Sequence, residues 1–324
     1  MGLLGNVLSL AGGLALFLFG MSLMSEGLEK RAGDQMKALL GRLTSNRFLG
    51  LLLGAGVTAL VQSSSAVTVM TVGFVNAGMM TLRQSIGVIM GANIGTTLTA
   101  WLLGLTQLEG SSFFLMLLKP SGFTPVLSVL GIVWYLSSKG DKKRYTGLVF
   151  LGFSVLIVGM DTMTAAMKPL AELPSFERAF LLFSNPLVGV LTGAILTAIL
   201  QSSSASVGIL QALSGAGQVT FGAVIPLVMG QNIGTCVTSL ISSVGAEKNA
   251  KRTAMVHLYF NLLGTLILLI PYLTLPYVPI GAFLTDSVTA FDVALIHTCF
   301  NLASTVILFP LAGLLEKLAV LMVR

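Results

Sequence analysis

The pentapeptide Gln62-Ser63-Ser64-Ser65-Ala66 recurs as Gln201-Ser202-Ser203-Ser204-Ala205, 139 residues further along the chain. A second polar block has the same spacing, because Gly91-Ala92-Asn93-Ile94-Gly95-Thr96 recurs as Gly230-Gln231-Asn232-Ile233-Gly234-Thr235. Aligned at this offset without gaps, residues 54–99 and 193–238 are identical at 20 of 46 positions. Chance agreement for so biased a composition is about a tenth to an eighth. The chain is therefore internally duplicated.

The composition is that of an integral membrane protein. Of the 324 residues, 55% are hydrophobic and only 9% are charged, whereas a soluble domain carries about 25% charged residues. The sequence pI is about 9.5, but the basic residues lie mostly in short loops between apolar runs. Such loops are typical of membrane orientation, so we expect a lipid bilayer and no nucleic acid as a partner. Cys236 and Cys299 give no disulfide framework and no metal-ligand spacing.

Seven apolar runs have the roughly 20 residues that crossing the hydrocarbon requires; they lie near 4–26, 82–104, 113–137, 146–167, 219–243, 253–271 and 289–311. Four shorter runs flank the serine blocks, at 48–61, 66–80, 187–200 and 205–217. Runs of that length are typical of re-entrant segments, whose tips must be buried in protein or face water. The predicted fold is an all-α membrane protein with two inverted-topology repeats, each with a re-entrant helical hairpin, and about seven full spans plus two hairpins.

The two repeats are expected to have opposite orientations in the membrane. Repeat one covers about 4–137, repeat two about 146–271, and an extra C-terminal span about 289–311, all within a single transmembrane domain, 1–324. Each repeat crosses the membrane an odd number of times. The second repeat therefore starts on the opposite side of the membrane from the first and has the inverted orientation. With the N-terminus outside and the C-terminus cytoplasmic, 15 of the 18 Lys and Arg residues lie on the cytoplasmic side, as the positive-inside bias requires. The expected location is the cell membrane, as a multi-pass protein.

Each serine block at a re-entrant tip can bind an anion without Lys or Arg. The hydroxyls and the free backbone N–H groups of a helix that begins there point at the ligand, and the helix dipole favours negative charge. Inversion brings the two tips in from opposite faces, so that six hydroxyls converge, those of Ser63, Ser64, Ser65, Ser202, Ser203 and Ser204. Hydroxyls both donate and accept hydrogen bonds. They therefore suit hydrogen phosphate, although sulfate stays open.

Hard oxygen ligands beside the anion suit Na⁺. The amides of Gln62 and Gln201 and the serine hydroxyls offer such oxygens, and Gly95 is expected to allow an unwound turn that exposes backbone carbonyls. Further hydroxyls come from Thr96, Thr97, Thr99, Thr235 and Thr238. Cys236 replaces the hydroxyl of Thr97, which makes the cation sites of the two halves unequal. No carboxylate lies in either motif, so a dianion and cations would neutralise each other.

The paired Gln-Ser-Ser-Ser, each followed by Gly-x-Asn-Ile-Gly-Thr, resembles the hallmark of the type II sodium-dependent phosphate cotransporter family, including its bacterial sodium–phosphate symporters. The resemblance covers about residues 14–310. It implies Na⁺-driven uptake of inorganic phosphate by alternating access, with Na⁺ as the coupling ion. It also implies roles in binding phosphate and Na⁺ for Gln62 to Ser65 and Gln201 to Ser204, and in Na⁺ coordination for Asn93, Thr96, Asn232 and Thr235.

Other readings stay open beside this one. The carrier could take sulfate or a small dicarboxylate, and a channel would need no paired anion site. A serine-dependent membrane enzyme is disfavoured, because neither histidine lies near a serine block and Gly-x-Ser-x-Gly is absent. We therefore expect no enzyme. Many family members carry a cytoplasmic regulatory domain after the membrane part, so a separate regulatory protein is a candidate partner here, as is a second copy in a homodimer.

Three ionisable residues within predicted spans are candidates for a further role. Asp161, which matches Ser22 of the first half, is either a functional acid or a paired structural one. His257 and His297 each precede an asparagine by four residues, which places the two side chains on one helix face. We expect these pairs to form helix–helix hydrogen bonds; a proton relay is the alternative.

Overall fold

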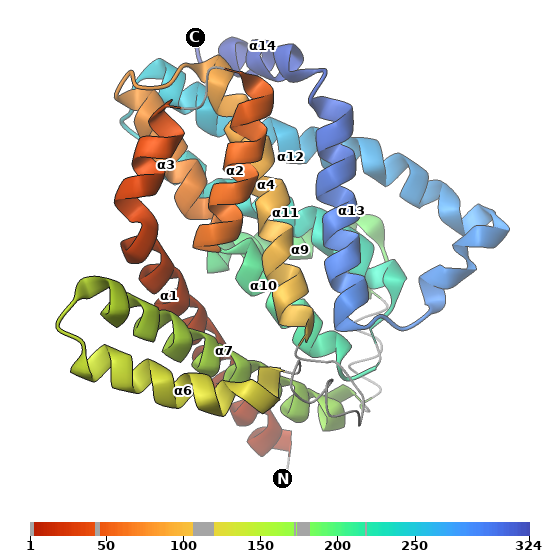
Figure 1. Ribbon diagram of the computed structural model, residues 1–324. Helices are drawn as coiled ribbons and strands as arrows, with labels where there is room; N and C mark the ends of the chain where they lie inside the picture. Colours follow the sequence, from red (N-terminus) through yellow and green to blue (C-terminus); the bar gives the residue numbers. More distant parts are fainter. Residues whose placement is uncertain (1–2, 43–45, 106–119, 172, 174–181, 218) are drawn as a thin grey trace.

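The computed structural model describes residues 3–42, 46–105, 120–171, 173, 182–217 and 219–324. In these residues every regular element is a helix (Figure 1). The α-helices are α1 (Leu3–Arg42), α2 (Arg47–Val61), α3 (Ser64–Asn76), α4 (Leu82–Gly104), α6 (Pro120–Ser137), α7 (Asp141–Ala171), α9 (Pro186–Leu200), α10 (Ser203–Ser214), α11 (Phe221–Ser242), α12 (Lys248–Thr274), α13 (Ala290–Leu308) and α14 (Ala312–Met322). Two 3₁₀-helices, η2 (Leu275–Tyr277) and η3 (Pro279–Thr285), join α12 to α13.

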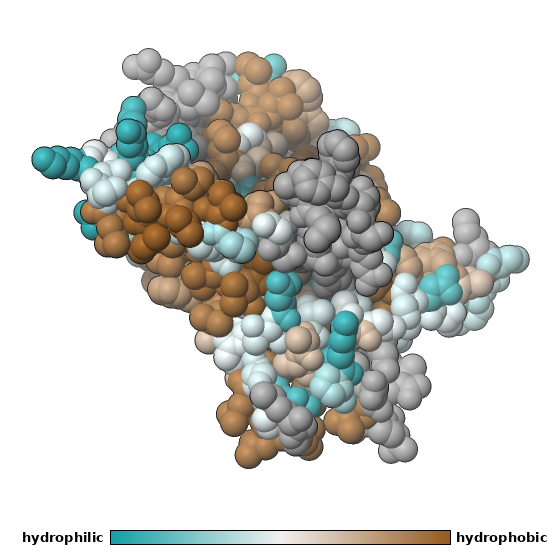
Figure 2. Space-filling view, turned by 60° about the horizontal axis from the view of Figure 1, so that its bottom comes forward, coloured by the Kyte–Doolittle hydropathy of each residue, from teal (hydrophilic) through white to brown (hydrophobic). Residues whose placement is uncertain are grey.

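Six helical stretches of the described chain are long and apolar enough to cross a membrane. They are Leu3–Arg31, Leu82–Gly104, Asp141–Leu170, Phe221–Ser242, Lys248–Tyr277 and Ala290–Leu308. Six of the seven predicted spans are thereby confirmed as candidates. The seventh, 113–137, lies partly outside the described residues, and its described part forms the shorter helix α6. Figure 2 shows wide apolar areas on the surface, as expected of helices that face lipid.

The four short apolar runs form four short helices, each beside a serine block. α2 and α9 have 15 residues each, and α3 and α10 have 13 and 12. At about 1.5 Å per residue these lengths are less than the thickness of a hydrocarbon core. The sequence did not predict α14, which follows Pro310. It packs through buried Ala312, Leu315 and Ala319 onto a core that includes Phe260 and Leu308.

The first helices of the two halves, α1 and α7, pack tightly through glycines. A Cβ atom added at Gly20 would lie 2.2 Å from the backbone nitrogen of Leu156. A Cβ atom added at Gly159 would lie 2.3 Å from the backbone nitrogen of Phe17. Adding the 139-residue offset to Gly20 and Phe17 gives Gly159 and Leu156. The two contacts are therefore the same contact with the halves exchanged.

A second pair of contacts obeys the same exchange. A Cβ atom added at Gly13 would lie 2.9 Å from the backbone nitrogen of Met163. A Cβ atom added at Gly152 would lie 2.3 Å from the backbone nitrogen of Met24. As residue numbers rise along α1, those of its partners fall along α7, so the helices run antiparallel. Contacts that map onto themselves when two copies are exchanged are isologous. The glycine contacts between the antiparallel helices α1 and α7 are of this kind.

Within each half, glycines also bring the helix before the serine block against the helix that carries the asparagine. A Cβ atom added at Gly91 of α4 would lie 2.0 Å from the carbonyl oxygen of Leu51 in α2. A Cβ atom added at the equivalent Gly230 of α11 would also lie 2.0 Å from a carbonyl oxygen, that of Val190 in α9. Only glycine allows so close an approach of two helix backbones. The duplication therefore extends from the sequence to the packing.

The helices after the serine blocks reach across to the opposite half. α3 packs against α11, and α10 packs against α4. The Nε2 of Gln211 in α10 donates to the carbonyl oxygen of Ala100 in α4 at 2.8 Å, and to that of Ala290 at the start of α13 at 2.9 Å. Each helix that follows a serine block is thus held beside the asparagine-bearing helix of the other half.

The glycine contacts predict a position-specific loss of stability. Gly91→Ala and Gly230→Ala should each destabilise the protein by about 1–3 kcal/mol or more, because the new methyl group overlaps a backbone carbonyl that cannot move alone. Gly73→Ala in α3 is the control, since a Cβ there meets nothing within 4 Å, and helix propensity favours alanine. The measurement is the Tm of each purified variant in detergent. Equal Tm values for all three variants would contradict the packing.

Candidate functional site

The first serine block occupies a sharp break between α2 and α3. Gln62 has φ 59° and ψ 25°, the left-handed conformation, and its N–H donates to the Thr58 carbonyl oxygen at 2.7 Å. Ser63 is the N-cap of α3, and its Oγ accepts the N–H of Ala66 at 3.2 Å. A side chain in the left-handed region costs about 1 kcal/mol or more. Such an outlier in the middle of a polar motif points to a functional constraint.

The second serine block repeats this geometry. Gln201 has φ 55° and ψ 23°, and its N–H donates to the Thr197 carbonyl oxygen, also at 2.7 Å. Ser202 caps α10 by accepting the N–H of Ala205 at 3.2 Å. These two glutamines are the only non-glycine residues with positive φ in the described chain. The same local strain therefore occurs twice, at matched positions.

The two blocks meet in space, although 136 residues separate the atoms that touch. The Oγ of Ser65 donates to the backbone oxygen of Gln201 at 3.2 Å. On the other side, the Oγ of Ser202 lies 3.8 Å from the Sδ of Met21 in α1. The tips thus lie against each other and beside the helix through which the halves pair.

The tips are not equivalent in their exposure to solvent. Ser64, Ser203 and Ser204 are buried, whereas Gln62 is 7% exposed and its counterpart Gln201 is exposed. The Nε2 of Gln62 donates to the carbonyl oxygen of Ala59, but its buried Oε1 has no hydrogen-bond partner in the described chain. A buried oxygen of this kind is costly unless a ligand or water satisfies it.

The asparagines of the second motif lie buried on the following helices. Asn93 of α4 and Asn232 of α11 each donate from Nδ2 to the carbonyl oxygen four residues back, at 2.9 Å in both halves. Thr96 and Thr235 are also buried, and each hydroxyl donates to the carbonyl oxygen four residues back at 3.0 and 2.9 Å. Because these donors are used within the helix, the side-chain oxygens keep lone pairs for a cation.

The predicted unwound turn at Gly95 is wrong. α4 is helical from Leu82 to Gly104, and α11 is helical through the equivalent Gly234. Gly95 is a packing residue: a Cβ there would lie 2.5 Å from the carbonyl oxygen of Ala55. Because the helix keeps its own hydrogen bonds, cation ligands at this level would have to come from side chains.

The threonines predicted as further ligands differ between the halves. The hydroxyls of Thr97 and Thr238 donate to the carbonyl oxygens three residues back at 2.7 and 2.9 Å. The buried Oγ1 of Thr99 has no partner in the described chain. Cys236, the counterpart of Thr97, instead contacts α12: its Sγ lies 3.3 Å from the Nδ2 of Asn261. The loss of symmetry at this position serves packing against α12.

Two buried threonines beside the tips were missed by sequence reasoning. Thr58 and Thr197 stand four residues before the two glutamines, and their hydroxyls are buried without a hydrogen-bond partner in the described chain. Gln231, next to Asn232, likewise has a buried, unpartnered Oε1. The sequence could have singled out the two threonines as candidate site residues, because they recur at the 139-residue offset.

The three ionisable residues that the sequence singles out within predicted spans lie in different surroundings. Asp161 of α7 is exposed. The Nδ1 of buried His257 in α12 is 3.0 Å from the Oγ of Ser239 in α11, which confirms the predicted helix–helix hydrogen bond. His297 is also buried, but neither of its ring nitrogens has a partner in the described residues, so the helix–helix hydrogen bond predicted for this histidine is not found there.

The arrangement is therefore a neutral polar site between two helix N-termini. Hydroxyls and the first N–H groups of α3 and α10 can stabilise an anion. Amide and hydroxyl oxygens can coordinate a hard cation. No group of three His, Cys, Asp or Glu side chains that could hold a metal ion occurs in the described part of the chain.

Comparison with known proteins agrees with this chemistry. The protein is 27% identical over 323 residues to YjbB of Salmonella typhimurium, which is provisionally named as an inorganic phosphate export protein; the match covers 98% of this chain and 56% of YjbB. YqeW of Bacillus subtilis, which has no assigned function, is 28% identical over 95% of both chains. The human sodium-dependent phosphate transport protein 2B is 35% identical over 113 residues, 34% of this chain and 16% of the human one.

The chain thus spans little more than half the length of YjbB. No solved structure matches it. The sequence profile of the Na⁺/Pi-cotransporter family, however, matches residues 16–165 and 174–281. This match includes both serine blocks, both asparagine blocks and most of the paired helices α1 and α7. The chain belongs to the Na⁺/Pi-cotransporter family.

Proposed function

We propose that the protein is a secondary transporter that couples the movement of inorganic phosphate to Na⁺ by alternating access, with both serine blocks as one substrate site. The observation that carries this proposal is the contact between the tips, where Ser65 of one block donates to the Gln201 carbonyl of the other. Membership of a phosphate transport family supports the substrate. The sodium-dependent relatives support the coupling ion.

Phosphate would bind between the N-termini of α3 and α10. Each helix offers unpaired N–H groups in its first turn together with a positive dipole end. The buried hydroxyls of Ser64, Ser203 and Ser204 would complete the site, with Ser63, Ser65 and Ser202 at its less buried edge. Hydroxyls can accept the phosphate O–H as well as donate to its oxygens.

Sodium would bind beside the phosphate at side-chain oxygen atoms from both halves of the chain. In the first half, the Oε1 of Gln62 is buried without a partner, and Ser63, Asn93, Thr96 and Thr97 are the other proposed ligands. In the second half the proposed ligands are Gln201, Ser202, Asn232, Thr235 and Thr238. Opposite charges a few ångströms apart in a site shielded from water attract strongly, so cation and anion should bind together.

The proposed transport cycle rests on inverted repeats and re-entrant hairpins. The reciprocal contacts of Gly20 with Leu156 and of Gly159 with Phe17 support inversion, because they relate antiparallel helices by an exchange of halves. The short lengths of α2, α3, α9 and α10 support hairpins that enter the membrane and return. Inverted repeats make it possible to open the site to either side in turn.

We further propose that transport runs inward, because cells keep Na⁺ low inside and a symporter follows that gradient. The name given to YjbB suggests the opposite direction for that relative. The test is uptake of radiolabelled phosphate into proteoliposomes with and without an inward Na⁺ gradient. We expect uptake that requires the gradient and is competed by unlabelled phosphate more strongly than by sulfate or succinate. Uptake that ignores Na⁺ would refute the coupling.

If both serine blocks form one site, a serine-to-alanine substitution in either block should weaken phosphate binding to a similar extent. Ser64→Ala and Ser203→Ala should each weaken phosphate binding about tenfold or more, because each removes a hydrogen bond to a charged ligand. Ser128→Ala in α6 is the matched control, since that hydroxyl donates to its own helix at Thr124. The measurement is the apparent affinity for phosphate in the uptake assay. If either tip variant keeps the affinity of the control, the shared site is wrong.

The left-handed turn allows stability to be separated from binding. Gln62→Gly should keep or raise the Tm, because glycine enters this conformation freely, while removing the amide oxygen from the proposed Na⁺ site. Gln62→Ala removes the same amide but keeps the strain, so it should be less stable than Gln62→Gly by about 1 kcal/mol. Both variants should need more Na⁺ for half-maximal uptake. An unchanged Na⁺ dependence would exclude Gln62 as a ligand.

A further inference from the structure

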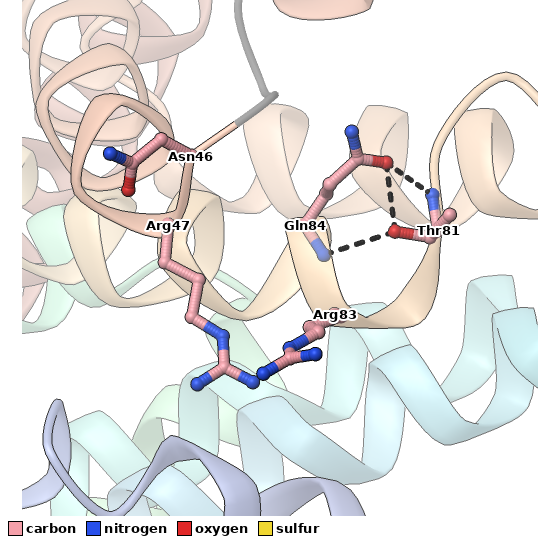
Figure 3. Close-up of a pocket in the computed structure, with 5 residues that line it drawn as sticks. All are labelled: Asn46, Arg47, Thr81, Arg83 and Gln84. Carbon is pink, nitrogen blue, oxygen red and sulfur yellow. Dashed lines mark hydrogen bonds between the residues drawn. The ribbon is translucent and has the colours of Figure 1, made fainter.

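A cavity of about 600 Å³ opens between the first turns of α2 and α4. Its lining residues are Asn46, Arg47, Thr81, Arg83 and Gln84 (Figure 3). The serine tip stands at the opposite end of α2, which has 15 residues and is therefore about 22 Å long. The cavity is a separate place in the molecule from the site proposed for transport.

The polar lining of this cavity consists of helix-capping side chains and two arginines. The Oδ1 of Asn46 accepts the N–H of Phe48 at 2.9 Å, and Thr81 and Gln84 form a reciprocal capping box at the start of α4. Figure 3 shows the side chains of Arg47 and Arg83 extending from the two helices into the same cavity. The helix caps need neither guanidinium group.

The positive charge of the pair is only partly compensated. Arg47 makes one long ion pair, from Nη2 to the Oε2 of Glu316 in α14 at 3.4 Å, and its buried Nε has no hydrogen-bond partner in the described residues. The five lining residues that the structure describes include no carboxylate. Two guanidinium groups that line one cavity repel each other, and an anion bound between them would offset this repulsion.

The second half of the chain lacks this feature. At the matching positions the two cap residues recur as Asn185 and Thr220, while the two arginines are replaced by Pro186 and Gly222. The duplicated helix pair therefore folds without arginines at these positions. Their presence in one half alone points to a role outside the helix packing.

We propose that the cavity binds a phosphate group, held by the paired guanidinium forks of Arg47 and Arg83. Arginine donates two parallel hydrogen bonds to phosphate oxygens, and two arginines suit one tetrahedral anion. The group could belong to an anionic phospholipid headgroup or to free orthophosphate, which present the same oxygens. The distribution of Lys and Arg among the loops predicts that this end of α2 lies at the cytoplasmic surface of the membrane. Basic residues at that surface attract anionic lipids.

A ligand in this cavity would hold α2 and α4 together, the helices that flank the first serine block and its asparagine. The carbonyl oxygen of Arg47 would lie 2.3 Å from a Cβ added at Gly87, so the cavity begins where α2 and α4 are in close contact. An anion bridging the two arginines would oppose separation of the helices at this end. Binding should therefore raise the thermal stability of the protein.

The experiment compares wild-type protein with Arg47→Gln/Arg83→Gln. Lys142→Gln/Lys143→Gln is the control, because it removes the same charge from exposed side chains in the first turn of α7. Native mass spectrometry measures retention of phosphatidylglycerol against phosphatidylcholine. Equilibrium dialysis in Na⁺-free buffer measures radiolabelled orthophosphate. We expect the double arginine variant to bind one of these anions about a hundredfold more weakly, and Arg83→Gln alone about tenfold more weakly.

The outcomes identify the ligand or reject the site. Selective loss of phosphatidylglycerol identifies a lipid headgroup, and selective loss of orthophosphate identifies free phosphate. Retention of both anions by the double arginine variant overturns the proposal, as does an equal loss in the lysine control. If the double variant is not monodisperse, Arg83→Gln decides, since this side chain is exposed and its removal should leave the fold intact. Neither assay depends on transport.

Discussion

A residue with a side chain enters the left-handed conformation only at a cost, yet this chain places a glutamine there twice, at Gln62 and Gln201. The turn ends one helix and starts the next within two residues, so that a serine caps the new helix immediately. Because the helices are interrupted at these turns, free N–H groups and hydroxyls become available in the interior of an apolar protein. The polar site depends on this interruption.

Glycine packing holds the strained turns in place. Carbonyl oxygens of Leu51 and Val190 contact Gly91 and Gly230, which fixes each tip relative to the helix that carries its asparagine. The antiparallel pairing of α1 and α7 joins the two halves. The contact between Ser65 and Gln201 then brings the tips together. Tight backbone packing can offset a local strain of about 1 kcal/mol at each turn.

The sequence predicted the features that depend on local pattern. The repeat, the four short helices and six of the spans follow from spacing and hydropathy, since apolar length decides whether a helix can cross a membrane. Helix α14 was missed because its buried stripe of Ala312, Leu315 and Ala319 is short and follows directly on the last span. Its place is set by contacts with distant helices.

Features that depend on tertiary packing could not be predicted in this way. Gly95 was expected to unwind a helix, but a distant carbonyl oxygen, that of Ala55, explains the glycine better. The unequal exposure of Gln62 and Gln201 is also invisible in two identical pentapeptides, because it arises from what surrounds each tip. Burial, more than residue type, distinguishes the two halves of the proposed site.

The central claim is that two tips form one site, and a structure determined with phosphate and Na⁺ bound tests it most directly. The account predicts density for one phosphate within hydrogen-bond distance of serines from both blocks, at the N-termini of α3 and α10, with Na⁺ density beside the amide of Gln62. Phosphate held by one block alone, or bound at a place remote from both, would contradict it.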